Sequence, residues 1–303
     1  FSSLPRPKTL DATVPWTQLP PDADVVEAAD GTIRDPREAD PTARGHLHWA
    51  PHGHPGHRSR LATLAAAADG DMAVLLSDVS AEVTAFARLL GLRTVSVTQP
   101  GERTDAPHAL AYDLADRILA PWAHGAVPAT ALAARGERVV WTGGISRYDG
   151  RAASDPGAER SVLLLGRVVD DETRARVQEQ LSARGWTVRA IGHDAHSRVD
   201  DPWPLLSSST VVVSAAGQNS VADLAAAGAR AVVVAQERPF AEQQATADAL
   251  ARWGLARVAP ADVSAAALAD LVEAAADDAP DWSRWQVSGA AGRFAAAVEA
   301  MLP

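Results

Sequence analysis

Residues 210–228 read Thr210-Val-Val-Val-Ser-Ala-Ala-Gly-Gln-Asn-Ser-Val-Ala-Asp-Leu-Ala-Ala-Ala-Gly228. The opening run of β-branched residues is typical of a strand that is buried on both faces. A turn of small residues follows, and a helical pattern of alanine and leucine begins near Gln218. A buried strand, a tight turn and a helix form one βα unit, which indicates an α/β protein with a parallel sheet.

The same alternation of apolar runs and helical patterns extends outward from this unit, beginning at Ala73. The expected strands are 73–76, 94–97, 161–165, 188–191, 210–214 and 231–235, and the expected helices are 79–90, 107–118, 171–184, 220–227, 241–253, 264–276 and 289–301. The stretch before Ala73 is interrupted by prolines, so we expect much of it to be loop. A polar, glycine-containing segment at 142–159 predicts a domain boundary near Gly150, with domains 1–150 and 151–303.

Composition limits the possible functions. At 303 residues the chain is long enough for two domains, and no apolar run approaches the roughly 20 residues of a membrane span. A net charge of −10 argues against nucleic acid as a partner, and the lack of cysteine excludes disulfides and thiolate metal sites. We expect a cytoplasmic protein, with peripheral attachment to the inner face of the membrane left open. The opening at Phe1 resembles the end of a strand, so we expect an N-terminal strand and helix to be missing.

The turn at Ala216–Gln218 suits an anionic ligand. Free N–H groups at the start of a helix and the positive end of its dipole attract a diphosphate, and the Ser220 hydroxyl adds a donor. The alternative is an ordinary βα turn that needs small residues only for packing.

The next strand leads into Gln236-Glu-Arg-Pro-Phe-Ala-Glu-Gln-Gln244, and here the sequence resembles a known family. The order of strand, Gly-x-x-Ser, Val-x-Asp-Leu-Ala-Ala-Ala-Gly, strand, Gln and Glu-Gln-Gln is similar to the C-terminal domain of family-28 glycosyltransferases. These enzymes have the GT-B fold, in which two Rossmann-like domains with parallel sheets face a cleft. The resemblance implies transfer of a sugar from a nucleoside-diphosphate donor, most simply a UDP-sugar, to a lipid-linked or small-molecule hydroxyl acceptor.

The resemblance also implies site residues, with no cofactor and no metal. Gly217 and Ser220 would contact the diphosphate, Asp223 the ribose, and Gln243 and Gln244 the sugar. The full implied donor site is Gly166, Arg167, Gly217, Gln218, Asn219, Ser220, Asp223, Gln236, Gln243 and Gln244. Two departures are evident. The family's glycine-rich loop after the first C-domain strand is reduced to 166–170, where Arg167 could replace a phosphate contact. The glycine- and histidine-containing loop expected near the acceptor is absent.

The segment His46-Leu-His-Trp-Ala-Pro-His-Gly-His-Pro-Gly-His57 holds five histidines in twelve residues. Dense histidine can bind metal, but two prolines interrupt the segment and no acidic ligand lies in register. We therefore expect a metal-free loop in the interdomain cleft, with His54 as a candidate general base, because imidazole titrates near neutral pH. Solvated loop histidines are the alternative.

Asp78 is the second catalytic candidate, since it ends a strand and could activate an acceptor hydroxyl. The alternative makes Asp78 the N-cap of the following helix. Arg103 could meet an anionic acceptor, or could only cap and pair. The acidic pair Asp69 and Asp71 resembles the motif of metal-dependent glycosyltransferases but precedes its strand, so we interpret it as a turn.

Motifs for dinucleotide redox chemistry, ATP hydrolysis and serine hydrolysis are absent from the sequence. We therefore predict a metal-independent glycosyltransferase. A nucleotide-sugar hydrolase or epimerase on the same fold, and an inactive nucleotide-sugar-binding protein, remain open.

Overall fold

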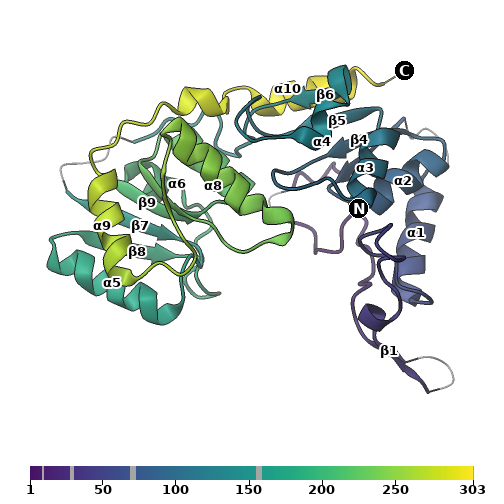
Figure 1. Cartoon of the computed structure of the whole chain (residues 1–303), viewed down its shortest axis with the longest axis horizontal. Helices are drawn as coiled ribbons and strands as arrows, with labels where there is room; N and C mark the ends of the chain where they lie inside the picture. Colours follow the sequence, from purple (N-terminus) through teal and green to yellow (C-terminus); the bar gives the residue numbers. More distant parts are fainter. Residues whose placement is uncertain (9, 28–30, 69–72, 155–158, 303) are drawn as a thin grey trace. The chain divides into compact units, whose positions relative to one another are not determined.

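The computed structural model describes residues 1–8, 10–27, 31–68, 73–154 and 159–302 (Figure 1). Within these residues the strands form a two-stranded sheet, a four-stranded sheet of order β3-β4-β5-β6 and a five-stranded sheet of order β11-β10-β9-β7-β8. The pairs β3–β4, β7–β8, β7–β9, β9–β10 and β10–β11 are parallel. The α/β prediction is confirmed. The acidic pair at positions 69 and 71 lies outside the described residues.

Internal contacts divide the chain into two compact units. Unit 1 comprises Phe1–Val97, Thr104–Ile118 and Ala300–Pro303, and unit 2 comprises Thr98–Arg103 and Leu119–Glu299. The domain boundary near Gly150 stays a prediction.

Unit 1 begins with a largely irregular segment, as the prolines predict. Its elements, in chain order, are β1 (Val26–Glu27), β2 (Ile33–Arg34), η1 (Pro36–Glu38), α1 (Pro55–Ala67), β3 (Val74–Asp78), α2 (Ala81–Leu89), β4 (Arg93–Val97), α3 (Ala106–Leu114) and the start of β5 (Arg117–Ala120). Pro55 occupies the first turn of α1, where a helix tolerates the missing N–H. Leu75, Ala87 and Leu92 form a small core between β3 and α2.

The expected helix 107–118 is wrong at its C-terminal end. α3 ends at Leu114, Ala115 is extended, and Ile118 belongs to β5. The Asp116 carboxylate accepts the Thr94 N–H at 2.8 Å, which holds the residue before β5 next to β4. Ile118 is fully buried, so tertiary packing overrides the local helical pattern.

Unit 2 contains the second Rossmann-like series. Its elements are α4 (Thr130–Ala133), η2 (Gly136–Arg138), β6 (Val139–Trp141), β7 (Ser161–Leu165), α5 (Asp171–Ala183), β8 (Thr187–Ile191), α6 (Trp203–Ser208), β9 (Val211–Ala215), α7 (Gln218–Ala227), β10 (Ala231–Val234), η3 (Pro239–Ala241), α8 (Glu242–Trp253), β11 (Arg257–Ala259), α9 (Ala265–Ala275), η4 (Trp282–Trp285) and α10 (Ala290–Glu299). One face of β9 and β10 joins α5 and α9 in one apolar core, to which the strands contribute Val211, Val213, Val232 and Val234.

Register aligns the carboxyl ends of the central strands of unit 2. Leu165 of β7 pairs with Ser214 of β9, and Ala215 pairs with Val234 of β10. The loops that follow these three strands therefore leave the same edge of the sheet, which is where ligands bind in open α/β sheets.

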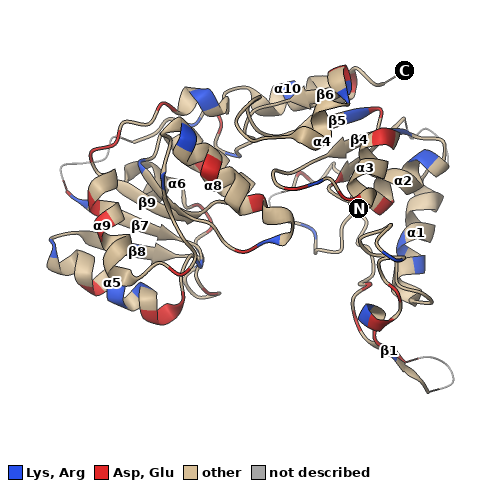
Figure 2. Ribbon diagram, viewed as in Figure 1, with Lys and Arg blue, Asp and Glu red and all other residues tan. Residues whose placement is uncertain are grey.

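The outer helices of unit 2 carry both signs of charge. Acidic and basic residues are interspersed on α5 and α8 (Figure 2), and on α5 Arg174 pairs with Asp171 at 2.9 Å. Exposed pairs of this kind contribute little to stability. In the part of the chain that the structure describes, none of the helices combines the length and the apolar character needed to cross a membrane.

Candidate functional site

The N-terminus of α7 lacks the side-chain cap that most other long helices have. Five helices begin at a residue whose side chain accepts a backbone N–H, namely His54, Ser80, Asp105, Asp170 and Ser264. α7 begins at Gly217, and within the described residues no side chain caps it. Val221 N–H bonds Gly217 O at 2.9 Å, so the amides of residues 218–220 are the ones left for a ligand.

Glutamine side chains surround this helix start. Gln218 Nε2 donates to Pro121 O at 3.3 Å, and Gln236 Nε2 donates to Val168 O at 2.9 Å. Gln243 is 6% exposed, and its Oε1 accepts the Gln236 N–H at 3.0 Å. A Cβ on Gly217 would lie 3.7 Å from Gln243 Nε2, which places this amide beside the start of α7. The loops after β9 and β10 thus meet at one place.

The other implied donor residues differ in their surroundings. Gly166 has φ +80°, a conformation that favours glycine, and its N–H bonds Ile191 O at 2.8 Å. Arg167 and Asn219 are exposed. Gln244 is exposed as well and donates to Asp248 one turn along α8 at 2.7 Å, so its amide is bonded along its own helix. Sugar contact by Gln244 stays a prediction.

Asp223 lies one turn beyond Ser220 on α7 and contacts the segment that follows β6. Ser146 Oγ donates to Asp223 Oδ1 at 2.7 Å, and Arg147 Nε lies 3.9 Å from Oδ2. Burial raises the pKa of the Asp223 carboxyl, although Ser146 and Arg147 act in the opposite direction. A half-buried carboxylate that retains acceptor capacity can bind a ligand hydroxyl.

The Gly143-Gly144 turn, two residues before Ser146, packs against Trp285 and α7. A Cβ on Gly144 would lie 2.6 Å from Trp285 Cδ1 and 3.3 Å from the Ala222 Cβ, so only glycine fits beside the Trp285 indole. Trp285 is 1% exposed and Trp282 donates its indole N–H to Ala229 O at 2.8 Å. Both tryptophans are therefore buried packing anchors beside α7.

His54 is used structurally in unit 1. Its Nδ1 accepts the His57 N–H at 3.2 Å, which caps α1, and its Nε2 contacts Asp24 O at 2.9 Å. The side chain is 5% exposed. These contacts engage both ring nitrogens, and the role of His54 as a base stays a prediction. The interpretation of the histidine segment as a loop is wrong from Pro55 onward, because α1 begins at that residue.

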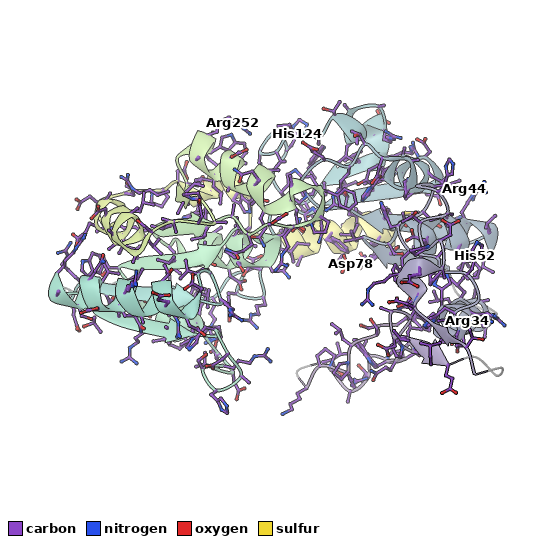
Figure 3. All side chains as sticks on the ribbon, turned by 60° about the horizontal axis from the view of Figure 1, so that its bottom comes forward. Arg34, Arg44, His52, Asp78, His124 and Arg252 are labelled. Atoms are coloured by element: carbon purple, nitrogen blue, oxygen red, sulfur yellow. The ribbon has the colours of Figure 1, made fainter. Side chains whose placement is uncertain are left out.

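Asp78, labelled in Figure 3, ends β3, is exposed and lines a cavity of about 510 Å³ in unit 1. The lining includes Ser2, Leu19, Arg60, Ser77, Asp78 and Ser80. Partial burial raises the pKa of Asp78. The next residue, Val79, has φ +68°, which is unusual for a β-branched side chain. The N-cap alternative for Asp78 is wrong, because Ser80 caps α2 through the Val83 N–H at 3.2 Å.

Arg103 bonds its own loop. Its Nε donates to Gln99 O at 2.8 Å, and its guanidinium lies 5.1 Å from the centroid of the Phe240 ring. A Cβ on Gly101 would lie 2.2 Å from Phe240 O, which also accepts the Glu102 N–H at 2.7 Å. This loop therefore packs closely against η3, next to the start of α8.

Sequence reasoning did not identify Asp105 and His108, which the structure brings to His48. Asp105 N-caps α3, a role that its position before a proline-containing helix could have indicated. The approach of His48 depends on tertiary structure.

No family model and no curated protein sequence matches this chain. Solved structures do match. The glycotransferase of kitacinnamycin is 18% identical with a TM-score of 0.61, over 81% of this chain and 80% of that one. MurG of Acinetobacter baumannii is 18% identical with a TM-score of 0.56, over 95% and 86%. The spinosyn rhamnosyltransferase SpnG, in complex with thymidine diphosphate, is 17% identical with a TM-score of 0.56, over 78% and 73%. This chain has the GT-B fold. The expected fold is confirmed.

Proposed function

We propose that this protein is a glycosyltransferase that moves a sugar from a nucleoside-diphosphate sugar to an acceptor hydroxyl. The observation that carries the proposal is the uncapped start of α7 at the carboxyl edge of the parallel sheet, beside Gln243. Its free N–H groups and helix dipole suit a diphosphate without a metal ion. The GT-B fold, shared with named glycosyltransferases, supports this assignment.

In the proposed reaction, the acceptor oxygen attacks the anomeric carbon while the bond from that carbon to the diphosphate oxygen breaks. The electron pair leaves with the diphosphate, where the amides of residues 218–220 stabilise the growing charge. These donors are fixed by the backbone of α7, so they need little reorganisation during the reaction. Asp223 binds the ribose hydroxyls through the acceptor capacity that Ser146 leaves.

On the acceptor side, we propose that Asp78 is the general base that takes the proton of the attacking hydroxyl. Its raised pKa brings the carboxyl closer to the operating pH, which improves a general base. The adjoining cavity of about 510 Å³ combines polar and apolar residues, as an acceptor pocket requires.

Nucleoside diphosphates should stabilise the folded protein by binding at the start of α7. UDP or TDP at about 100 times Kd should add about 2.7 kcal/mol to the free energy of unfolding. Thermal unfolding and calorimetric titration measure this effect. Added Mg²⁺ should leave the affinity unchanged, because backbone N–H groups hold the phosphates. Binding that strictly requires Mg²⁺, or no response to any nucleoside diphosphate, would contradict the proposed site.

Product analysis then tests the reaction class. A panel of UDP- and TDP-sugars with hydroxyl acceptors should give a glycoside. Free sugar, with no glycoside in the presence of acceptor, would indicate a hydrolase, and an altered donor sugar would indicate an epimerase. Tight donor binding without turnover would indicate a binding protein.

A further inference from the structure

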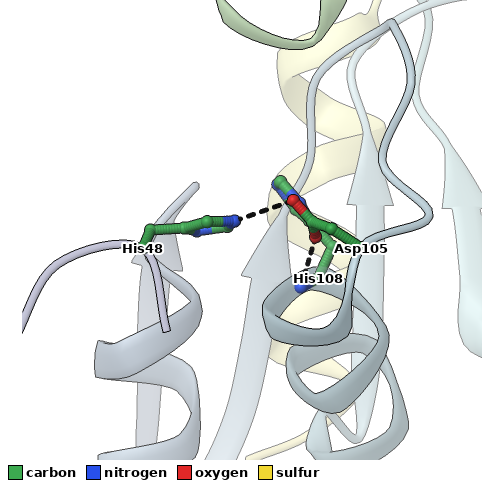
Figure 4. A group of neighbouring side chains, drawn as sticks. All are labelled: His48, Asp105 and His108. Atoms are coloured by element: carbon green, nitrogen blue, oxygen red, sulfur yellow. Dashed lines mark hydrogen bonds and ion pairs between the residues drawn. The ribbon is translucent and has the colours of Figure 1, made fainter. Parts of the chain in front are cut away.

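Three side chains of unit 1 converge on one point (Figure 4). His48 Nε2 lies 3.1 Å from Asp105 Oδ2, and His108 Nδ1 lies 2.6 Å from Asp105 Oδ1. The potential ligand atoms of the three residues all lie within 4.8 Å of one another. His48 comes from the histidine segment 46–57, whereas Asp105 and His108 belong to the start of α3.

We propose that His48, Asp105 and His108 bind a divalent transition metal of the zinc class. Two imidazoles and a carboxylate are ligands that zinc and iron(II) accept. Ligand atoms bound tetrahedrally at about 2.0–2.1 Å lie roughly 3.3 Å apart. The distance of 3.1 Å between His48 Nε2 and Asp105 Oδ2 is close to this value. His108 Nδ1 lies closer to Asp105, at 2.6 Å from Oδ1, so a bound metal ion would replace this hydrogen bond. The fourth position is left to water, as is usual for zinc with three protein ligands.

Neighbouring groups hold these ligands in position. Glu82 Oε1 accepts the His48 N–H at 2.6 Å and the Trp49 N–H at 3.2 Å, and it lies 4.0 Å from His48 Nδ1. At 4.0 Å the carboxylate is too far from Nδ1 for a hydrogen bond, so Glu82 holds His48 through its backbone N–H. The His108 side chain is only 4% exposed, so its ring has little freedom to turn away.

The N-cap of α3 accounts for only part of this arrangement. Asp105 Oδ1 accepts the His108 N–H at 3.0 Å, which is an ordinary N-cap. Ser80, Asp170 and Ser264 cap their helices in the same way, and in none of these caps does a described histidine ring contact the capping side chain. At Asp105, by contrast, two imidazoles approach different oxygens of one carboxylate. Their ring centroids are 4.5 Å apart, close enough for one ion to bind both rings.

The metal would join the irregular histidine segment to α3. The sequence predicts no acidic ligand in register because Asp105 lies 57 positions beyond His48. The proposed site shares no residue with the donor site on α7, so it does not rest on the proposed function.

The test uses the full chain after treatment with a chelator. We expect calorimetric titration with ZnCl₂ to show one bound Zn²⁺ per chain and a higher melting temperature. Substituting Co²⁺ should give the visible absorption of a four-coordinate site with nitrogen and oxygen ligands. His48→Gln and Asp105→Asn should each weaken Zn²⁺ binding at least about tenfold. Asparagine can still cap α3, which separates metal binding from folding.

His52→Gln is the matched control. His52 lies in the same segment, but its side chain is 81% exposed, and we expect unchanged Zn²⁺ affinity (Figure 3). Equal Zn²⁺ affinity in wild type, His48→Gln and Asp105→Asn would overturn the proposal, as would the lack of stoichiometric binding. If Asp105→Asn fails to fold, His48→Gln still decides the question, because His48 lies outside regular secondary structure. Unchanged nucleotide binding by these variants keeps this test separate from that of the donor site.

Discussion

At the scale of single residues, the ribose contact proposed for Asp223 sets ligand binding against stability. Its carboxylate is held by Ser146 and faces Arg147, yet burial raises its pKa. Folding therefore takes up a proton between the ordinary pKa and the raised one. The free energy of unfolding falls as pH rises through this interval, and the charged form remains a cost at neutral pH. A charged side chain that lowers stability in this way is typical of a binding or catalytic site.

We predict that Asp223→Asn raises the melting temperature at pH 7 and weakens binding of nucleoside diphosphate. The asparagine oxygen can still accept from Ser146, so the substitution removes the charge and keeps this contact. Replacing a charge-assisted hydrogen bond by a neutral one should cost roughly 5- to 15-fold in affinity. Denaturation and calorimetry on the two proteins measure both effects, and the stability gain should vanish well below pH 3.8, the ordinary pKa of the carboxyl.

Asp270→Asn is the control for loss of charge. Asp270 has a side chain that is 70% exposed on α9 and pairs with Arg184, so nucleotide affinity should not change. Unchanged affinity in Asp223→Asn as well would remove the ribose contact from α7.

At the scale of elements, sequence patterns located most strands of unit 2 because each is a short, continuous apolar run. β7 was predicted at its observed bounds of Ser161–Leu165. α1 was not predicted, since Pro55 suggested loop although it occupies the first helical turn. Side-chain contacts were beyond sequence reasoning. Ser146 and Asp223 are 77 positions apart in the sequence, and the hydrogen bond between them forms only in the folded chain.

The N-terminus of α7 has no side-chain cap, so adding a cap tests whether a ligand uses its N–H groups. Gly217 has φ −68° and ψ 145°, which any residue can adopt, and a Cβ there makes an ordinary contact at 3.7 Å. Gly217→Asp should therefore cap α7 and stabilise the protein by roughly 0.5–1 kcal/mol. The new carboxylate takes the N–H groups proposed for the diphosphate and repels it. We expect nucleotide affinity to fall at least about 100-fold in a calorimetric titration, as the loss of two charge-assisted bonds implies.

Gly217→Ala separates charge from size at this position. Alanine fills the same space without an acceptor, so most of the nucleotide affinity should remain. Wild-type affinity in Gly217→Asp would show that the diphosphate does not contact the start of α7.

At the scale of the whole molecule, the two proposed ligands belong to different compact units. The residues of the proposed metal site lie in unit 1, and the amides proposed to bind the diphosphate lie in unit 2. Ligand binding stabilises the backbone that it contacts against local opening, and this effect can be measured amide by amide. Hydrogen exchange with each ligand added alone can therefore map both sites without any substitution.

We predict two separate patterns of protection in hydrogen exchange followed by mass spectrometry. A nucleoside diphosphate should slow exchange in peptides that cover 216–224 and the start of α8, because their amides lie at or beside the bound phosphates. Zn²⁺ should slow exchange in peptides that cover 46–58 and 104–109, since the ion joins these segments directly. Peptides from α5, which contributes to neither site, serve as the internal reference. Nucleotide protection confined to 46–58, or Zn²⁺ protection confined to 216–224, would show that the two ligands have been assigned to the wrong residues.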